Sequence, residues 1–159
     1  DLRMSRGLGD VYKRQVQNVY AHSSGGGKFI AVIQFKKTVP SDEGRQRQAA
    51  LLAFSAFPEL KQVILVDEDV DIFDTNDVLW AMTTRMQADV DIVTIPGVRC
   101  HPLDPSNDPA CSWSIRDHGI ACKTIYDATV PFNQKARFQR AKFMEVDVKK
   151  FLPDFTVQD

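Results

Sequence analysis

No hydrophobic run in this sequence is long enough to cross a bilayer, and neither sign of charge dominates. A membrane-spanning helix needs about 20 consecutive, mostly apolar residues, and the apolar runs here are far shorter. The formal net charge is −1 over 159 residues, so no basic surplus favours nucleic acid or an anionic membrane. We therefore expect neither of these partners. With 43% hydrophobic residues and no internal repeat, the chain can bury the core of one domain.

Cysteine is also scarce. Cys100, Cys111 and Cys122 cannot all pair with one another, and free thiols indicate a reducing cytoplasm. Together with His101 and His118 they could be mistaken for a zinc site. Zinc sites are normally built from short chelating pairs such as C-x-x-C, and these five residues contain no such pair. The sequence therefore predicts no zinc site.

The first fifteen residues differ in character from the rest. DLRMSRGLGDVYKRQ resembles a translated sequencing adapter of the kind that contaminates assembled environmental reads. We therefore expect residues 1–15 to be a non-native tail and residues 16–159 to form a single α/β domain. A native basic terminus is the alternative.

One stretch joins a strand, an acidic turn and a helix without a gap. Residues 63–66 are all apolar, as in a parallel strand that is covered on both faces. A helix is predicted over 75–86, with Asp74 or Thr75 as its N-cap. Between them lies the edge where open α/β sheets usually bind ligands. The carboxylates of this region are Asp67, Glu68, Asp69, Asp71, Asp74 and Asp77.

The neighbouring segments alternate between strand and helix patterns. Strands are predicted at 28–36 and 92–95, the second stopping at Pro96-Gly97. Between the first strand and the acidic turn, Ser41 can cap a helix over 42–57. This succession predicts an α/β fold of three layers, with a mostly parallel sheet and helices on both faces.

Each of the two helices has an apolar face, which we expect to lie on the sheet. In the helix over 42–57 this face consists of Ala49, Leu52, Ala53 and Ala56. In the helix over 75–86 it consists of Val78, Leu79, Met82 and Met86.

The pattern breaks down after the last of these strands. Residues 98–119 form a long irregular loop, and loops of this length in a compact domain tend to be functional. Beyond it we expect an extended segment at 121–128, a basic surface helix at 133–142 and an edge strand at 144–148.

The acidic turn invites three functional interpretations and one structural interpretation. An EF-hand is excluded, because Ile72 and Val78 stand where a calcium loop needs glycine and a bidentate glutamate. A haloacid-dehalogenase-like phosphatase would use the carboxylates of Asp67 and Asp69 as nucleophile and as acid and base. That motif should open its domain, whereas here a strand and a helix precede it. A D-x-D site for a metal and a sugar nucleotide is a weaker match, because two carboxylates are easily found by chance in so acidic a turn. In the structural interpretation the carboxylates cap the next helix and pair with Lys or Arg.

Three motifs in succession resemble a known family. VDEDVD and NDVLWAMTTRM lie within residues 63–86, and CKTIYDATVP spans 122–131. In this order they resemble the C-terminal region of the UbiD family of decarboxylases, which includes phenolic-acid and pyrrole-carboxylate decarboxylases. The resemblance runs from about residue 16 to residue 155. It implies a C-terminal domain fragment of a larger carboxy-lyase that acts, without net oxidation, on an aromatic, phenolic or heteroaromatic acid.

The resemblance also implies a cofactor and a few site residues. A prenylated FMN acts as the electron sink while carbon dioxide leaves, and a lysine in the K-x-x-Y context, here Lys123, reaches its phosphate. Tyr126 matches a position near the aromatic substrate. We expect His118 in the same crevice, where its imidazole can hydrogen-bond a phenol. The alternatives are a surface lysine, a core tyrosine and a solvent-exposed histidine.

The remaining functional parts implied by the family lie upstream of residue 16. They are an Arg and a Glu pair that handle the proton, and an Asn, a His and a Glu that hold a divalent metal, Mn or Mg; potassium is implied as well. We therefore expect no catalytic residue and no metal ligand in this chain, and no activity from it alone. Family members use this domain for dimer contacts, which predicts a homodimer or higher homo-oligomer. A non-catalytic dimerisation module is the remaining alternative.

Overall fold

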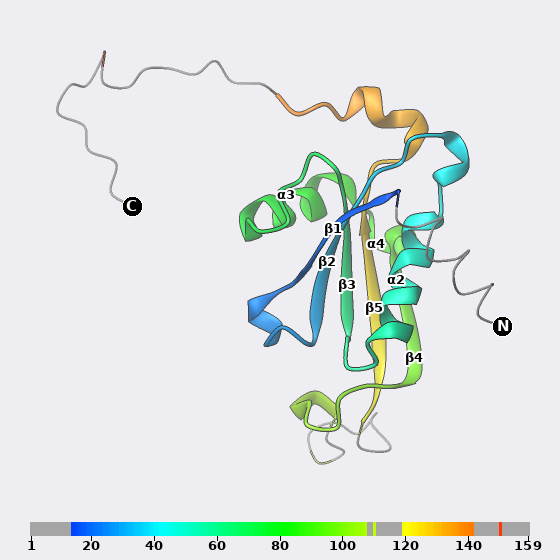
Figure 1. Cartoon of the computed structure of the whole chain (residues 1–159), viewed down its shortest axis with the longest axis vertical. Helices are drawn as coiled ribbons and strands as arrows, with labels where there is room; N and C mark the ends of the chain where they lie inside the picture. Colours follow the sequence, from blue (N-terminus) through cyan, green and yellow to red (C-terminus); the bar gives the residue numbers. More distant parts are fainter. Residues whose placement is uncertain (1–13, 108–109, 111–118, 142–149, 151–159) are drawn as a thin grey trace.

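A computed structural model describes residues 14–107, 110, 119–141 and 150 of the chain (Figure 1). Its centre is a five-stranded mixed sheet in the order β1-β2-β3-β5-β4. β2, β3 and β5 are parallel to one another, whereas β1 and β4 run antiparallel at the two edges. The strands are β1 (Val16–Ala21), β2 (Ile30–Phe35), β3 (Gln62–Asp67), β4 (Ile92–Arg99) and β5 (Ile120–Ala128).

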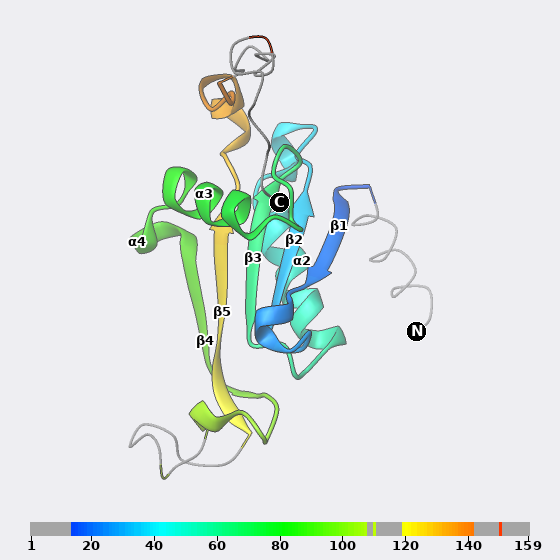
Figure 2. The ribbon, with the colours of Figure 1, turned by 90° about the vertical axis from the view of Figure 1, so that its left-hand side faces the viewer.

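Helices cover both faces of the sheet. α2 (Arg45–Ala56) lies on one face and α3 (Thr75–Arg85) on the other, while α4 (Ala88–Asp91) is a short turn before β4 (Figure 2). The predicted α/β class and the three layers are confirmed. The 3-10 turns are η1 (Ser23–Gly25), η2 (Pro40–Asp42), η3 (Pro105–Asn107) and η4 (Phe132–Arg137).

Alternation along the central strands builds one core on each face. Ile33 and Leu65 pack with Phe54 on the α2 face. Val32 and Val66, their neighbours in sequence, pack on the α3 face. Because successive side chains of a strand point to opposite faces, a strand that is covered on both faces must be apolar throughout, which explains the run at 63–66.

The order of strands and helices predicts that β4 runs parallel to β3. In the structure β4 runs in the opposite direction. α3 runs across the strands instead of back along them (Figure 2), and its last residue, Arg85, reaches Asp67 at the end of β3. The chain therefore re-enters the sheet at the same end of the strands at which it left β3. From there β4 runs antiparallel to β5. The sheet is consequently mixed, with a parallel centre.

The predicted end of β4 at Pro96-Gly97 is wrong. The strand continues to Arg99, and its register against β5 shifts between Ile95 and Val98. An extra residue in one strand is accommodated as a bulge, often with glycine at positive φ, and Gly97 has a φ of 71°. The Pro-Gly pair therefore bends this edge strand instead of ending it.

The boundaries of α2 also differ from the prediction. Its N-cap is Gly44, with a φ of 86°, and Ser41 lies in the preceding 3-10 turn. That turn is ordered by the buried carboxylate of Asp42, which accepts hydrogen bonds from the Thr38 N–H and, at 3.1 Å, from Nε2 of Gln15. Gln15 is the last residue of the predicted tail, and the non-native origin of residues 1–15 stays a prediction.

The buried face of α2 is rotated from the predicted one. Ala49 is buried as expected, but Leu52 is 40% exposed, and Phe54 occupies the core in its place. The aromatic ring buries more apolar area than the leucine would, and this favours the observed rotation.

α3 begins and ends as predicted, within one residue. The side chain of Asp74 accepts a hydrogen bond from the Asn76 N–H at 2.9 Å and caps the helix. Leu79, expected on the apolar face, is 51% exposed, whereas the charged Arg85 is buried. Pairing with Asp67 and Asp69 draws this arginine inward.

The last described segments agree with the prediction only in part. β5 confirms the extended segment at 121–128. The surface helix expected at 133–142 is a short 3-10 helix, η4, whose position is set by contacts of Lys135 with acidic residues. The strand expected at 144–148 lies outside the described residues. No helix among the residues that are described is both long and apolar enough to span a membrane.

Replacing Leu65 with alanine should lower the free energy of unfolding by about 2–5 kcal/mol, because this side chain is fully buried and its removal leaves a cavity. Leu52→Ala removes the same atoms from a half-exposed position and should cost about 1 kcal/mol or less. Urea unfolding followed by circular dichroism measures both. Equal losses for the two variants would contradict the described core.

Candidate functional site

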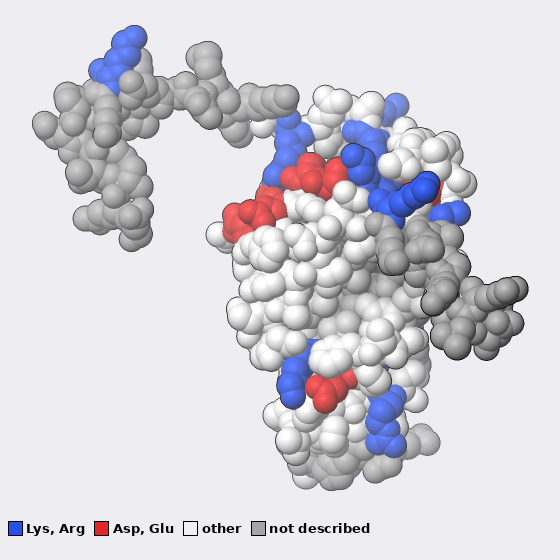
Figure 3. Space-filling view, in the orientation of Figure 1, with Lys and Arg blue, Asp and Glu red and all other residues white. Residues whose placement is uncertain are grey.

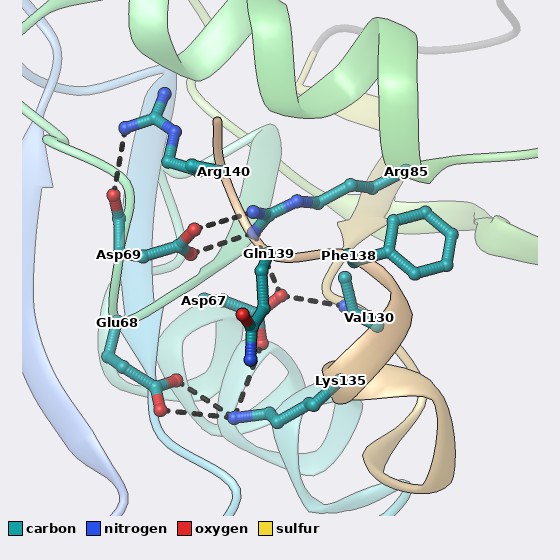
Figure 4. A pocket seen from close by; sticks show the side chains of 9 residues that line it. All are labelled: Asp67, Glu68, Asp69, Arg85, Val130, Lys135, Phe138, Gln139 and Arg140. Carbon is teal, nitrogen blue, oxygen red and sulfur yellow. Dashed lines mark hydrogen bonds and ion pairs between the residues drawn. The ribbon is translucent and has the colours of Figure 1, made fainter. Parts of the chain in front are cut away.

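A hollow lies at the carboxyl ends of the parallel strands. It is open to solvent, has a volume of about 630 Å³, and lies where β3 ends and where the chain leaves β5 (Figure 4). This is the edge at which open α/β sheets usually bind ligands. Its lining residues are Asp67, Glu68, Asp69, Arg85, Val130, Lys135, Phe138, Gln139 and Arg140.

Asp67, the last residue of β3, joins four parts of the chain. Its side chain is buried, and Oδ2 accepts a hydrogen bond from Nη1 of Arg85 at 3.1 Å and from the N–H of Val130 at 2.7 Å. Oδ1 faces Nζ of Lys135 at 3.9 Å. One carboxylate thus holds the end of α3, the chain beyond β5 and η4 to the end of β3.

Arg85 bridges two of the acidic residues. Its Nη1 and Nη2 donate to the two oxygens of Asp69 at 2.8 and 2.6 Å, in addition to the bond to Asp67. Its guanidinium also lies 4.9 Å from the ring centre of Trp80. Bidentate, charge-assisted bonds of this kind are among the strongest polar contacts in proteins, so Arg85 fixes both carboxylates.

The two carboxylates respond differently to this environment. Burial raises the pKa of Asp67, and the Val130 N–H and the charge of Lys135 oppose it only in part. Burial acts in the same direction on Asp69, but the hydrogen bonds and charge of Arg85 outweigh it and lower the pKa of that carboxyl. The same pairs raise the pKa of Arg85 against the effect of its own burial.

Two cations from the segment after β5 close the outer side of the hollow. Nζ of Lys135 contacts both oxygens of Glu68, at 3.1 and 2.9 Å. The guanidinium of Arg140 pairs with the carboxylate of Asp77 and stacks 4.1 Å from the ring centre of Trp80. Acidic and basic side chains accordingly lie next to one another along this edge of the molecule (Figure 3).

A second group of charges, of which Lys37 and Asp127 are buried, holds the chain as it leaves β5. Nζ of Lys37 donates to the carbonyl of Val130 at 3.1 Å and to Glu43 at 2.8 Å, and the other oxygen of Glu43 accepts from the N–H of Phe132. Asp127 accepts hydrogen bonds from Arg47 and from the Thr129 hydroxyl. Charged side chains therefore hold both the D-A-T motif at the end of β5 and the residues that follow it.

These contacts support the structural interpretation of the acidic turn over the phosphatase. Asp67 and Asp69 share one guanidinium, which leaves neither as a free nucleophile, and Asp74 caps α3. Within the described ranges no group of three His, Cys, Asp or Glu side chains could hold a metal ion. The turn differs from a solvated acidic face in one respect, because Asp67 is buried.

The structure does not bring the predicted site residues together. Lys123 is buried on the α2 face, where Nζ donates to the carbonyl of Pro58 at 2.7 Å and lies 5.0 Å from the ring centre of Phe54. Tyr126 packs against the core on the α3 face. Residues three apart on a strand point to opposite faces, so these two side chains cannot line one crevice from within β5. His118 lies outside the described residues.

Lys123 as described does not by itself fit a phosphate ligand. Burial lowers the pKa of its ammonium, and a phosphate would have to replace the Pro58 carbonyl as its partner. The role of Lys123 at a flavin phosphate stays a prediction, as do the roles of Tyr126 and His118.

Sequence reasoning missed the cations of the observed site. The sequence pattern places Arg85 in a helical motif, and it predicts that Lys135 and Arg140 lie on a basic surface helix. One signal for Arg85 is its place as a basic residue in the last turn of a helix that begins beside an acidic turn. Its side chain can reach the carboxylates of that turn only if the helix crosses the ends of the strands. The sequence contains no comparable signal for Lys135 or Arg140, because the predicted surface helix over 133–142 would leave both side chains in solvent.

The chain is similar in sequence and in fold to known decarboxylases. The family model of the 3-octaprenyl-4-hydroxybenzoate carboxy-lyase C-terminal domain matches residues 8–128. Gallate decarboxylase of Lactiplantibacillus plantarum is 57% identical over 140 residues, which make up 87% of this chain and 29% of that protein. The chain therefore spans less than a third of the length of this relative.

Solved structures agree with the sequence comparison. The apo structure of a 3,4-dihydroxybenzoic acid decarboxylase from Enterobacter cloacae matches with a TM-score of 0.79 and 64% identity, over 88% of this chain and 29% of that one. The UbiD-class enzyme HmfF from Pelotomaculum thermopropionicum, in complex with FMN, matches with a TM-score of 0.73 and 31% identity, over 89% and 29%. An evolved dimeric form of HmfF in complex with prFMN matches at 0.60 and 26%, over 91% and 26%.

Replacing Arg85 with methionine should lower the free energy of unfolding by about 3–5 kcal/mol, because it removes the cation that is hydrogen-bonded to the buried Asp67. Lys28→Met is the matched control: Lys28 pairs with Glu59 at 3.5 Å, but its side chain is 52% exposed, so about 0–1 kcal/mol is expected. Chemical denaturation of both variants at pH 7 measures the difference. A loss for Arg85→Met no larger than the control would contradict the bridging role.

The dependence of stability on pH should distinguish the two carboxylates. Asp69 has a lowered pKa in the folded state, so its contribution is fully present above the usual value of 3.8 and is lost as the pH falls through the folded value. Asp69→Asn should therefore flatten the loss of stability below about pH 4. The pKa of Asp67 is raised, so its contribution to stability is fully present below 3.8 and is lost as the pH rises through the folded value. Asp67→Asn removes this loss, so the free energy of unfolding should rise more steeply with pH above 3.8 than in the unchanged chain. Denaturation midpoints between about pH 2 and 7 measure both slopes, and slopes that change in the same direction would refute the assignment.

Proposed function

This chain belongs to the family of the UbiD C-terminal domain, and on that basis we propose that it acts as part of a carboxy-lyase that removes carbon dioxide from an aromatic carboxylic acid. The observation that carries the proposal is the 57% identity over 140 residues to a gallate decarboxylase. The 64% identity to a 3,4-dihydroxybenzoic acid decarboxylase supports it independently. Because the chain spans less than a third of either protein, the activity belongs to an enzyme larger than the described domain.

The same relatives narrow the substrate that we propose. Gallate and 3,4-dihydroxybenzoate are both benzoic acids with neighbouring hydroxyl groups, and the two proteins named for them share higher identity with this chain than HmfF does. We therefore propose a hydroxylated benzoic acid as substrate, in preference to a heteroaromatic acid. Tyr126 and His118 remain proposed neighbours of that substrate, on the strength of the family motif alone.

We further propose prenylated FMN as the cofactor, which would supply the electron sink for decarboxylation. Support comes from HmfF, whose structures contain FMN and prFMN. Since Lys123 in this structure is bound to the Pro58 carbonyl, no reaction step is derived from it. The divalent metal, Mn or Mg, and the potassium are implied by the family resemblance alone, which assigns their ligands to other parts of the enzyme.

Within that enzyme, the described residues would supply a rigid edge. The Asp67 and Arg85 contacts fix the ends of β3 and α3 together, and Lys37 and Asp127 fix the chain beyond β5. A group held by several charge-assisted bonds loses little freedom when a neighbouring domain packs on it. This edge would therefore position, but not carry out, the chemistry.

The remaining proposals concern assembly and compartment. Leu51, Leu52 and Phe57 are exposed on the outer side of α2, and such a patch suits contact with another subunit in a homodimer or larger homo-oligomer. Cys100 and Cys122 are both free thiols, in keeping with the reducing cytoplasm that we propose.

A chimera tests the proposed function. Residues 16–141 would replace the matching segment of the Enterobacter cloacae 3,4-dihydroxybenzoic acid decarboxylase, and carbon dioxide release from 3,4-dihydroxybenzoate and gallate would be measured with the flavin supplied. At 64% identity we expect the segment to fold in place and activity to remain within about tenfold of the parent, a barrier change of about 1.4 kcal/mol or less.

The 159-residue chain alone is the matched control and should release no carbon dioxide. A chimera that folds and takes up flavin but is inactive would refute the proposal. Activity from the chain alone would refute the expectation that the catalytic groups lie outside it.

A further inference from the structure

The segment that closes one side of the hollow is held to the domain without burying a side chain. We call residues 133–141 the strap; it begins within η4 (Figure 4). None of its residues is buried. Apolar burial, the dominant favourable term in folding, therefore does little to keep the strap in place. Its residues that line the hollow are Lys135, Phe138, Gln139 and Arg140.

Immediately before the strap, the chain is fixed by buried groups. The N–H of Val130 donates to Oδ2 of Asp67 at 2.7 Å, and Nζ of Lys37 donates to the Val130 carbonyl at 3.1 Å. These three residues are all buried. The last of these anchoring contacts is made by the N–H of Phe132, which donates to Glu43 at 2.9 Å. A movement of the strap would therefore turn about Phe132.

The strap itself is held by two partly exposed cations. Nζ of Lys135 contacts both oxygens of Glu68, at 3.1 and 2.9 Å, and its side chain is 26% exposed. The guanidinium of Arg140, whose side chain is 37% exposed, pairs with Asp77 and stacks 4.1 Å from the ring centre of Trp80. It also donates to a backbone carbonyl of the acidic turn at 3.0 Å. Ion pairs between exposed side chains contribute little and weaken in salt, so the contacts that close the strap are individually weak.

Closure of the strap also has a cost at Asp67. This residue is buried, and its Oδ1 accepts no hydrogen bond from any residue that the structure describes. The strap faces this oxygen through Nζ of Lys135 at 3.9 Å, a distance too long for a hydrogen bond. A buried acceptor without a partner is costly and rare, and water would satisfy this one if the strap moved away. Weak contacts thus favour the closed strap, whereas an unsatisfied oxygen opposes it.

We propose that the strap opens and closes over the hollow, turning at Phe132, and that Lys135 and Arg140 make the contacts that close it. In the open form water reaches Oδ1 of Asp67, and the hollow loses the side that Phe138 helps to form. The movement thereby controls access to the end of β3. It needs neither flavin nor decarboxylation, so it goes beyond the proposed function, and the chimera can fail without affecting it.

Amide hydrogen exchange, followed by NMR on the full chain, separates the moving strap from its anchor. The N–H of Gln134 donates to the carbonyl of Pro131 at 2.8 Å, across the proposed turning point, so opening exposes it to solvent. The N–H of Val130, bound to Asp67, should stay protected in both forms. Raising the NaCl concentration from about 0.1 to 1 M shortens the Debye length from about 10 to 3 Å. This change should speed exchange of the Gln134 amide about three- to tenfold and leave that of Val130 unaltered.

Substitution of Arg140 tests the closing contact itself. Arg140→Met removes the ion pair and the stacked cation, and should speed exchange of the Gln134 amide about three- to tenfold at low salt, with circular dichroism confirming a folded chain. Arg45→Met is the matched control: Arg45 lies 3.9 Å from Asp42 and is 35% exposed, but it is outside the hollow's lining, so the exchange should not change. Local fraying of η4 alone would not respond to Arg140→Met. No change at Gln134, the same change in both variants, or equal acceleration at Val130 would each overturn the proposal.

Discussion

One buried carboxylate organises the edge of this domain at which the parallel strands end. Asp67 ends the central strand β3, and its oxygens face the end of α3, the chain that leaves β5 and the 3-10 helix η4. Remote parts of the sequence thus converge on a single side chain. Taking a carboxylate out of water is expensive unless hydrogen bonds and an opposite charge compensate, and here Arg85 and the Val130 N–H do so on one oxygen. The cost also explains why the arrangement is specific, since a misplaced partner would leave the charge buried without compensation.

Below this edge, the domain is held by apolar packing; at the edge itself, it is held by charge. The central strands place alternate side chains in two cores, one under α2 and one under α3. The segment after β5 makes few buried apolar contacts beyond Val130, and instead reaches Glu68 and Asp77 through Lys135 and Arg140. Contacts between exposed charges weaken as salt screens them, whereas buried pairs are screened much less. The outer contacts should therefore be the first to loosen, while the Asp67 and Arg85 pair keeps the strands in place.

Sequence patterns predicted the elements whose signals are local. The run at 63–66 and the Asp74 cap of α3 depend on neighbouring residues alone, and both were found as expected. The placement of β4 was not predictable in this way, because it depends on α3 crossing the strands, which a long-range contact between Arg85 and Asp67 fixes. The buried face of α2 was missed for a related reason, since Phe54 and Leu52 compete for the core and only the shape of the sheet decides between them. The motif around Lys123 and Tyr126 identified the family, but in a strand its two residues point to opposite faces, so the motif could not define one pocket.

The crossing helix α3 also sets a length that the chain must keep. It begins at its cap, Asp74, and its last residue, Arg85, must return to the strand end from which the chain departed. Each residue of an α-helix turns the following side chains by about 100°. A single inserted or deleted residue between these two points would therefore direct the guanidinium away from both carboxylates, even if every side chain were retained. In related sequences α3 should consequently be conserved in length more strictly than in composition, and insertions should accumulate in other segments of the domain.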